Sequence, residues 1–179
     1  RLALDVGGIP RYATYVSGNG SAALVFEYVV QAGDTDANGI ALAGLDLRGE
    51  TLTDFAGNDL NMVLNGVGST AGVLIDTTVP TATNISRVDT SPSNSGSVSF
   101  TVAFSERVGN VDASDFELVF SGSAFGSIGS ITTVDGLTYT VNVSGLVGTG
   151  SVRLDLKPGT DIADAAGNRV AAGLAGGGY

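Results

Sequence analysis

Residues 98–104 read Val-Ser-Phe-Thr-Val-Ala-Phe, so that large apolar side chains alternate with small or polar ones. Because successive side chains of a strand point to opposite faces, this pattern predicts a β-strand with one buried face. The same alternation recurs in four further segments: Leu24–Val30, Phe116–Phe120, Leu137–Val143 and Val152–Leu156. No stretch of the chain has the periodicity of a helix of any length. We therefore expect an all-β protein.

Turn-forming residues separate these segments. Gly18-Asn19-Gly20, Asn65-Gly66 and Asp135-Gly136 are suited to tight hairpins, since they tolerate the positive φ angles that such turns need. Short strands at this spacing favour an antiparallel β-sandwich.

The chain also repeats itself. Residues 24–60 run parallel to residues 137–170, and both contain Leu-Asp-Leu (45–47 and 154–156) followed by Asp-x-Ala-Gly-Asn (54–58 and 164–168). Two copies of one unit are therefore expected, with domains at 1–76 and 77–179. The segment that joins them, Asp76–Pro80, combines proline with β-branched residues, which makes it extended and stiff.

The two copies are unequal. The second has seven candidate strands, at about 82–88, 97–105, 115–120, 125–133, 137–143, 151–157 and 169–174, of which the last is weak because it runs into a glycine-rich tail. The first copy begins where the second has already reached its third strand, so the equivalents of the first two strands are missing. Such a sandwich exposes an unpaired edge. Either the chain is an excised piece of a longer protein, as its start at Arg1 suggests, or another chain supplies the missing strands.

Composition excludes several classes of function. The chain has 8 basic and 18 acidic residues, a net charge of −10, and neither His nor Cys. Nucleophilic catalysis that needs an imidazole or a thiol is therefore excluded, and a zinc site is disfavoured. The acidic balance disfavours nucleic acid and anionic membranes as partners, and no apolar run is long enough to span a membrane. We expect no catalytic residues and no enzymatic activity.

The segment Asp34-Thr35-Asp36-Ala37-Asn38-Gly39 places oxygen-bearing side chains at alternate positions before a glycine, like the first half of an EF-hand loop. The glutamate expected at position 12 of such a loop is absent, because that position is Leu45. The segment predicts a calcium site that is not a true EF-hand. The alternative is a solvated turn.

The alternating strand directions of a sandwich would bring further acidic groups to the joint between the copies. Asp76 lies in the joining segment, Glu106 follows the second strand of the second copy, and Asp164 and Asn168 lie in its last loop. Together with Asp34, Asp36 and Asn38 they form an all-oxygen set that suits Ca²⁺, which would turn the repulsion between the carboxylates into binding. Alternatively, the Asp-x-x-Gly-Asn loops form Asx turns without metal.

Several of these motifs, taken in order, resemble the bacterial Ig-like repeats of large secreted or cell-surface adhesins. They are Asp76–Thr81, Phe104-Ser105-Glu106, Val111–Phe116 and Asp164–Asn168, with Phe26–Asp36 and Leu45-Asp46-Leu47 in a related repeat type. The resemblance implies tandem Ig-like antiparallel β-sandwiches, of which the first lacks its N-terminal strands. It also implies an extracellular location at the bacterial surface, a role in adhesion or biofilm formation, and calcium that stiffens the joints.

The leading hypothesis is thus a calcium-rigidified extracellular spacer whose partners are neighbouring Ig-like repeats, of the same chain or of another copy. The second hypothesis is a filament subunit that self-assembles by strand exchange, with Leu2–Val6 or the C-terminal tail as the exchanged element. A third, a carbohydrate-binding module, is weakened by the lack of Trp.

Overall fold

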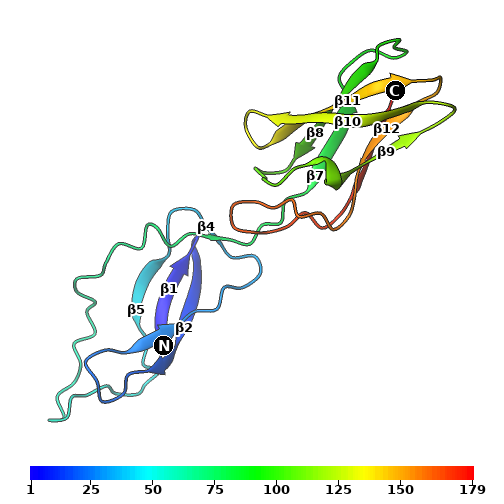
Figure 1. The fold of residues 1–179 in the computed structure, drawn as a ribbon. Helices are drawn as coiled ribbons and strands as arrows, with labels where there is room; N and C mark the ends of the chain where they lie inside the picture. Colours follow the sequence, from blue (N-terminus) through cyan, green and yellow to red (C-terminus); the bar gives the residue numbers. More distant parts are fainter. The chain divides into compact units, whose positions relative to one another are not determined.

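The computed structural model describes residues 1–179 and contains β-strands, loops and one turn of 3-10 helix, η1 (Ala113–Asp115). The all-β prediction is confirmed. The chain divides into two compact units, Arg1–Thr78 and Val79–Tyr179 (Figure 1). Each unit is described by itself below.

The second unit consists of two antiparallel sheets. Its strands are β7 (Ala82–Arg87), β8 (Ser97–Phe104), β9 (Phe116–Phe120), β10 (Phe125–Thr133), β11 (Thr138–Val147), β12 (Val152–Leu156) and β13 (Leu174–Gly178). One sheet has the order β10-β11-β8-β7 and the other β13-β12-β9. Figure 1 shows β8 and β11 in one layer, with β9 and β12 in the other.

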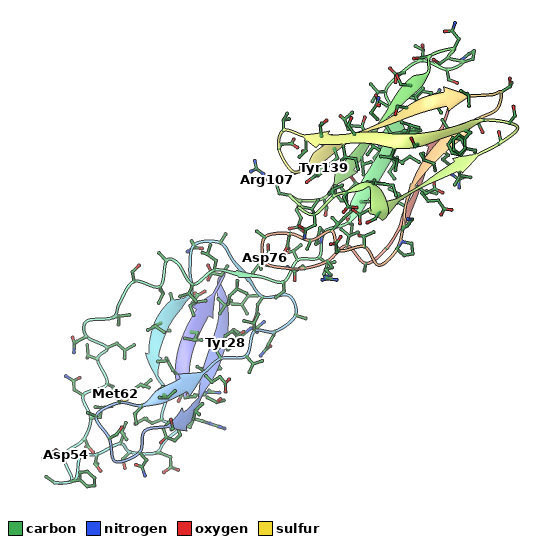
Figure 2. All side chains as sticks on the ribbon, viewed as in Figure 1. Tyr28, Asp54, Met62, Asp76, Arg107 and Tyr139 are labelled. Atoms are coloured by element: carbon green, nitrogen blue, oxygen red, sulfur yellow. The ribbon has the colours of Figure 1, made fainter.

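The core of the second unit lies between these sheets. The alternating residues Val98, Phe100, Val102 and Phe104 of β8 are all buried, as the period-two pattern predicts. They join Val141 and Val143 of β11 and Leu154 of β12 in one hydrophobic cluster. Because both sheets contribute to a single cluster, the unit has the character of a β-sandwich. Tyr139 also reaches this core, and its hydroxyl donates to the carbonyl of Val108 at 2.6 Å (Figure 2).

The last strand lies later in the chain than its predicted position at 169–174, which is a correction. Residues 169–173 belong to a loop, and β13 covers Leu174–Gly178, so the strand consists mainly of the glycine-rich tail that was expected to follow it. The strand forms here because its glycines have no side chains that would collide with the neighbouring strands. A side chain at Gly176 would meet the carbonyl oxygen of Leu154 and would lie 2.7 Å from Cγ2 of Ile85. Glycine therefore lets β13 approach both its partner β12 and strand β7.

Replacing Gly176 by alanine is expected to destabilise the second unit by about 1–3 kcal/mol, because the new methyl group overpacks a site bounded partly by backbone. Gly177 is the matched control, since its nearest neighbour for an added Cβ is the carbonyl oxygen of Ile85 at 4.0 Å. Urea denaturation of both variants measures the difference. Equal midpoints for Gly176→Ala and Gly177→Ala would contradict the packing argument.

The first unit is built on one four-stranded antiparallel sheet, in the order β3-β2-β1-β5. Its strands are β1 (Leu2–Val6), β2 (Ile9–Ser17), β3 (Val25–Glu27), β4 (Thr35–Asp36), β5 (Ala41–Leu45) and β6 (Ile75–Asp76). The short strands β4 and β6 pair separately with each other. The predicted strand Leu24–Val30 is thus only partly formed, since just its residues 25–27 are paired.

The core of the first unit is thin. Its buried apolar residues are Leu4, Val6 and Ala13, with six partly buried side chains around them. Residues 46–74 contain no strand, only an isolated bridge between Thr53 and Asp59, and many of their apolar side chains are exposed. Figure 2 shows Asp54 and Met62, both from this segment, at the end of the unit opposite to Asp76.

Two of the three predicted turns join strands. Gly18-Asn19-Gly20 lies between β2 and β3, and Asp135-Gly136 lies between β10 and β11, where Gly136 has φ +70°. The hairpin predicted at Asn65-Gly66 is wrong, because no strand lies on either side of it. A further hairpin, which joins β1 to β2 through Gly7 and Gly8, was not predicted.

Candidate metal centre

Glu106 is positioned by the end of strand β8. This strand is paired on both sides, with β7 and with β11, so the place where it ends is well fixed. Just beyond it, Ser105 binds Thr81 twice: the Ser105 amide donates to the Thr81 carbonyl at 2.8 Å, and the Thr81 amide donates to the Ser105 hydroxyl at 2.9 Å. Glu106, which is half-buried, therefore lies next to the start of the second unit.

Asp164 is positioned by a closed loop of five residues, Asp164–Asn168. The Asn168 amide donates to one carboxylate oxygen of Asp164 at 2.9 Å, and the Asn168 side-chain amide donates to the other at 2.8 Å. The flanking residues Ile162 and Val170 are buried and joined by a backbone hydrogen bond, which anchors the loop to the core. The amide of Ala166 also donates to the Asp164 carboxylate. This bond, to the amide two residues on, makes the Asx turn considered above as the alternative to metal binding.

The two carboxylates lie close together. A carboxylate oxygen of Glu106 and one of Asp164 are within 4.8 Å of each other, and both side chains are half-buried. Burial raises the pKa of Asp164, but the hydrogen bonds from Asn168 outweigh this effect and hold the pKa below its usual value. Asp164 is therefore an anion at neutral pH. Two acidic side chains at this distance favour a bound cation.

Asp34, predicted as a ligand, is buried in the first unit among donors from the protein itself. The Arg11 guanidinium binds its carboxylate at 2.7 Å, the Gln31 amide donates to it at 2.8 Å, and the Tyr28 hydroxyl donates to it as well. The hydrogen bond from Tyr28, then that from Gln31 and the nearby Arg11 charge, lower the pKa of Asp34. Arg11 thus supplies the positive charge that a metal ion would otherwise bring.

Asp36, the second predicted ligand of this segment, caps backbone groups. Its carboxylate accepts from the amides of Gly7 at 2.9 Å, Asn38 at 3.1 Å and Gly39 at 2.8 Å, and these bonds, led by that of Gly7, lower its pKa. Asn38 is exposed and follows Asp36 in the same turn. The structure therefore gives Asp34 and Asp36 separate sets of partners within the first unit.

Asp76 is the last residue of β6, where it pairs with Thr35. Its carboxylate accepts from the Thr78 amide at 2.9 Å, and the intervening Thr77 hydroxyl donates to the carbonyl of Asp34 at 3.0 Å. Asp76 is exposed and belongs to the first unit, three residues before the second unit begins at Val79.

The two Asp-x-Ala-Gly-Asn loops have the same local geometry. Asp54 accepts from the Asn58 amide at 2.9 Å and from the Asn58 side chain at 2.8 Å, as Asp164 does from Asn168. Both loops also have a glycine at positive φ in the fourth position, with φ +86° at Gly57 and φ +92° at Gly167. The same motif therefore forms the same closed loop in both units.

No family model, curated protein or solved structure matches the chain. The structure also contains no helix with the length and apolar character needed to cross a membrane. What the chain does is therefore inferred from its own residues.

The sequence pattern did not predict the roles of Arg11 and Tyr28. Both are long side chains that bring a donor to the buried carboxylate of Asp34. The available signal was Arg11 itself, which lies among apolar and aromatic residues in the segment that forms β2, because a partly buried charge needs an opposite charge beside it.

Proposed function

We propose that this chain is a calcium-binding, Ig-like spacer segment of an extracellular bacterial adhesin. The observation that carries the proposal is the pair of half-buried carboxylates, Glu106 and Asp164, within 4.8 Å of each other at the end of the second unit where its first strand begins. A hard cation with oxygen ligands is the natural occupant of such a pair, and Ca²⁺ accepts irregular geometry.

The strand order of the second unit supports the Ig-like part of the proposal. In an immunoglobulin constant-type sandwich the first, second, fifth and fourth strands form one sheet, and the third, sixth and seventh form the other. Numbered from β7, the sheets β7-β8-β11-β10 and β9-β12-β13 have this order. The extracellular location and the role in adhesion rest on the resemblance to surface repeats.

The ligands that we propose are Glu106 and Asp164, which both belong to the second unit. We leave Asp34 and Asp36 out of this set, because protein donors already surround their carboxylates.

Calcium at 10 mM is expected to stabilise the second unit by about 1–3 kcal/mol, given dissociation constants of about 10⁻⁴–10⁻³ M for extracellular modules. For a unit of this size the melting temperature should rise by roughly 5–15 °C over that in EDTA. Glu106→Gln should remove most of the rise, while the exposed Glu117→Gln is the matched control.

Isothermal titration provides a second measurement, in which Glu106→Gln should bind calcium more weakly than the parent chain. Melting curves that are identical with calcium and with EDTA would refute the calcium site.

Strand exchange, the second hypothesis for function, has less support. Of the two segments considered for exchange, β1 is already paired with both β2 and β5, and β13 is paired with β12.

A further inference from the structure

Three Asn-Gly sites occur in the first unit, at residues 19–20, 38–39 and 65–66. At such a site the amide nitrogen of the glycine can attack the side-chain carbonyl carbon of the asparagine, because glycine has no Cβ in the way. A new C–N bond closes a five-membered imide ring, and ammonia leaves. Water then opens the ring at one of its two carbonyl carbons. The net reaction consumes water, releases ammonia and leaves aspartate or isoaspartate.

The three sites have the same dipeptide, so the fold around each of them decides how readily it reacts. The ring closes only when the glycine nitrogen and the side-chain carbon come into contact in the right orientation. The glycine amide must also be free to lose its proton. Hydrogen bonds from the glycine amide and restraints on the backbone therefore both slow the reaction.

The site Asn38-Gly39 is closed by Asp36. The Gly39 amide, which is the nucleophile, donates to the Asp36 carboxylate at 2.8 Å, and the Asn38 amide donates to the same oxygen at 3.1 Å. Asp36 is only 4% exposed. A negative charge so close disfavours loss of the proton from the Gly39 amide. The nucleophile of this site is therefore held inactive.

Packing also holds Gly39 in place. A Cβ at Gly39 would collide with the carbonyl oxygen of Thr70 and lie 2.6 Å from Cα of Ala71, so the backbone of Gly39 lies directly against that segment. The next amide, of Ile40, donates to the carbonyl of Val73 at 3.3 Å. Rotation of the backbone at Gly39 would break these contacts.

The site Asn19-Gly20 lies in the turn between β2 and β3 and is restrained in part. The Ser21 amide donates to the carbonyl of Gly18 at 3.0 Å and closes the turn, while the Asn19 amide donates to the Tyr15 hydroxyl at 2.8 Å. Both residues of the site are exposed. The turn therefore limits rotation of the backbone, but these bonds do not use the Gly20 amide.

The site Asn65-Gly66 is open. Both residues are exposed and lie in the segment 46–74, which contains no strand. The side-chain nitrogen of Asn65, which is the leaving group, donates to the carbonyl of Val63 at 3.1 Å, and the Gly66 amide makes no hydrogen bond within the protein. A Cβ at Gly66 would meet nothing within 4 Å. Neither hydrogen bonding of the nucleophile nor packing therefore opposes ring closure here.

We propose that Asn65 is a site of spontaneous deamidation, and that the three sites react in the order Asn65, Asn19, Asn38. Asp36 then protects Asn38 in addition to capping the turn. Each event adds a negative charge to the first unit, and the isoaspartate product also adds a CH₂ group to the main chain. None of these residues belongs to the proposed pair of calcium ligands, so the reaction is tested independently of the spacer function.

Peptide mapping of the full chain tests the proposal. The chain is kept in mildly alkaline buffer at physiological temperature and digested at acidic pH. Liquid chromatography with mass spectrometry then separates the asparagine, aspartate and isoaspartate forms of each peptide. Asn65 should be converted at least about tenfold faster than Asn38, because the hydrogen bond from Gly39 to the charged carboxylate must open first. The rate at Asn19 should lie between the other two.

The same chain in concentrated urea is the control for intrinsic reactivity. Unfolding removes the hydrogen bond from Gly39 to Asp36 and the packing of Gly39 on Thr70. The three sites should then react at similar rates, and the rate at Asn38 should increase the most.

Two glycine variants identify the nucleophile, and both lie outside the strands of the unit. Gly66→Ala should slow the conversion of Asn65 by about tenfold or more, because the added methyl group hinders the approach of the attacking nitrogen. Gly68→Ala, at an equally open position outside the site, should leave the rate at Asn65 unchanged. Equal rates at Asn65 in the two variants would contradict attack by the Gly66 amide.

Three further outcomes would overturn the proposal. They are conversion of Asn38 as fast as Asn65 in the folded chain, an Asn65 that stays intact while the chain in urea is converted, and an unchanged order of the three rates in urea. The last result would assign the differences to neighbouring residues in the sequence and not to the fold.

Discussion

Replacing Phe100 by alanine is expected to destabilise the second unit by about 3–5 kcal/mol, the usual cost of removing a fully buried phenylalanine. Phe100 has no exposed surface and lies in the middle of β8, where it contacts side chains from both sheets. Its ring also packs edge-to-face on Tyr179, with 5.0 Å between the ring centres. The cavity left by the ring therefore opens at the centre of the core. Chemical denaturation followed by far-UV circular dichroism measures the loss.

Phe55 is the matched control for Phe100, because its side chain is 99% exposed in the loop 54–58. Phe55→Ala should change the free energy of unfolding by no more than about 0.5 kcal/mol. A similar loss in both variants would mean that the core of the second unit is not where the structure places it.

The first unit is expected to lose its cooperative unfolding transition when Asp34 is replaced by alanine. Asp34 is the most buried charged residue of this unit and binds donors from β2, from Tyr28 and from the turn at Gln31. The variant leaves Arg11 without its carboxylate in a unit with only three buried apolar residues. Removing one partner of a buried ion pair is among the most destabilising single changes. Calorimetry should show the second unit's transition alone.

The dependence of unfolding on pH checks the same carboxylate. The pKa of Asp34 is lowered in the folded state, by Tyr28 first and then by Gln31 and Arg11. The contribution of Asp34 to the stability of the first unit is therefore fully present above about pH 3.9, the pKa of an aspartate in the unfolded chain. It is lost as the pH falls through the lower pKa that Asp34 has in the folded state. The parent first unit should lose stability below about pH 4. Glu50→Ala, at an exposed acidic residue, should show the same dependence of stability on pH as the parent.

A cooperative unfolding transition of the first unit in Asp34→Ala would contradict the stabilising role of the Asp34 carboxylate.

Much of the second unit could be predicted from its sequence, because its strands are half-buried and alternate cleanly. Strands β7 to β12 lie within two residues of their predicted starts, and β8 agrees with its pattern in every buried residue. The final strand was misplaced since glycine has no side chain to alternate. What determines β13 is the close approach of its backbone to Leu154 and Ile85, which local sequence does not reveal.

The first unit was harder to predict. Its segment 60–67 is as apolar as a strand, yet it is unpaired, because pairing depends on a neighbouring strand and not on propensity alone. The acidic candidates show the same limit. Sequence spacing identified Asp34 and Asp36 as oxygen ligands for a metal ion. Their hydrogen-bond donors in the structure, Arg11 and Gly7, lie more than twenty residues away along the chain.

The neighbouring strands β7 and β13 have a mechanical consequence. Ile85 lies beside Gly176, and the Arg87 side chain donates to the carbonyl of Gly178, so residue numbers rise in the same direction along both strands. Tension applied between residues 79 and 179 would pull these two strands past each other along their length. Their contacts, with the Tyr179 hydroxyl bound to the amides of Val88 and Asp89, would then bear the load together. The second unit should therefore resist stretching in this direction better than peeling of β10 from β11.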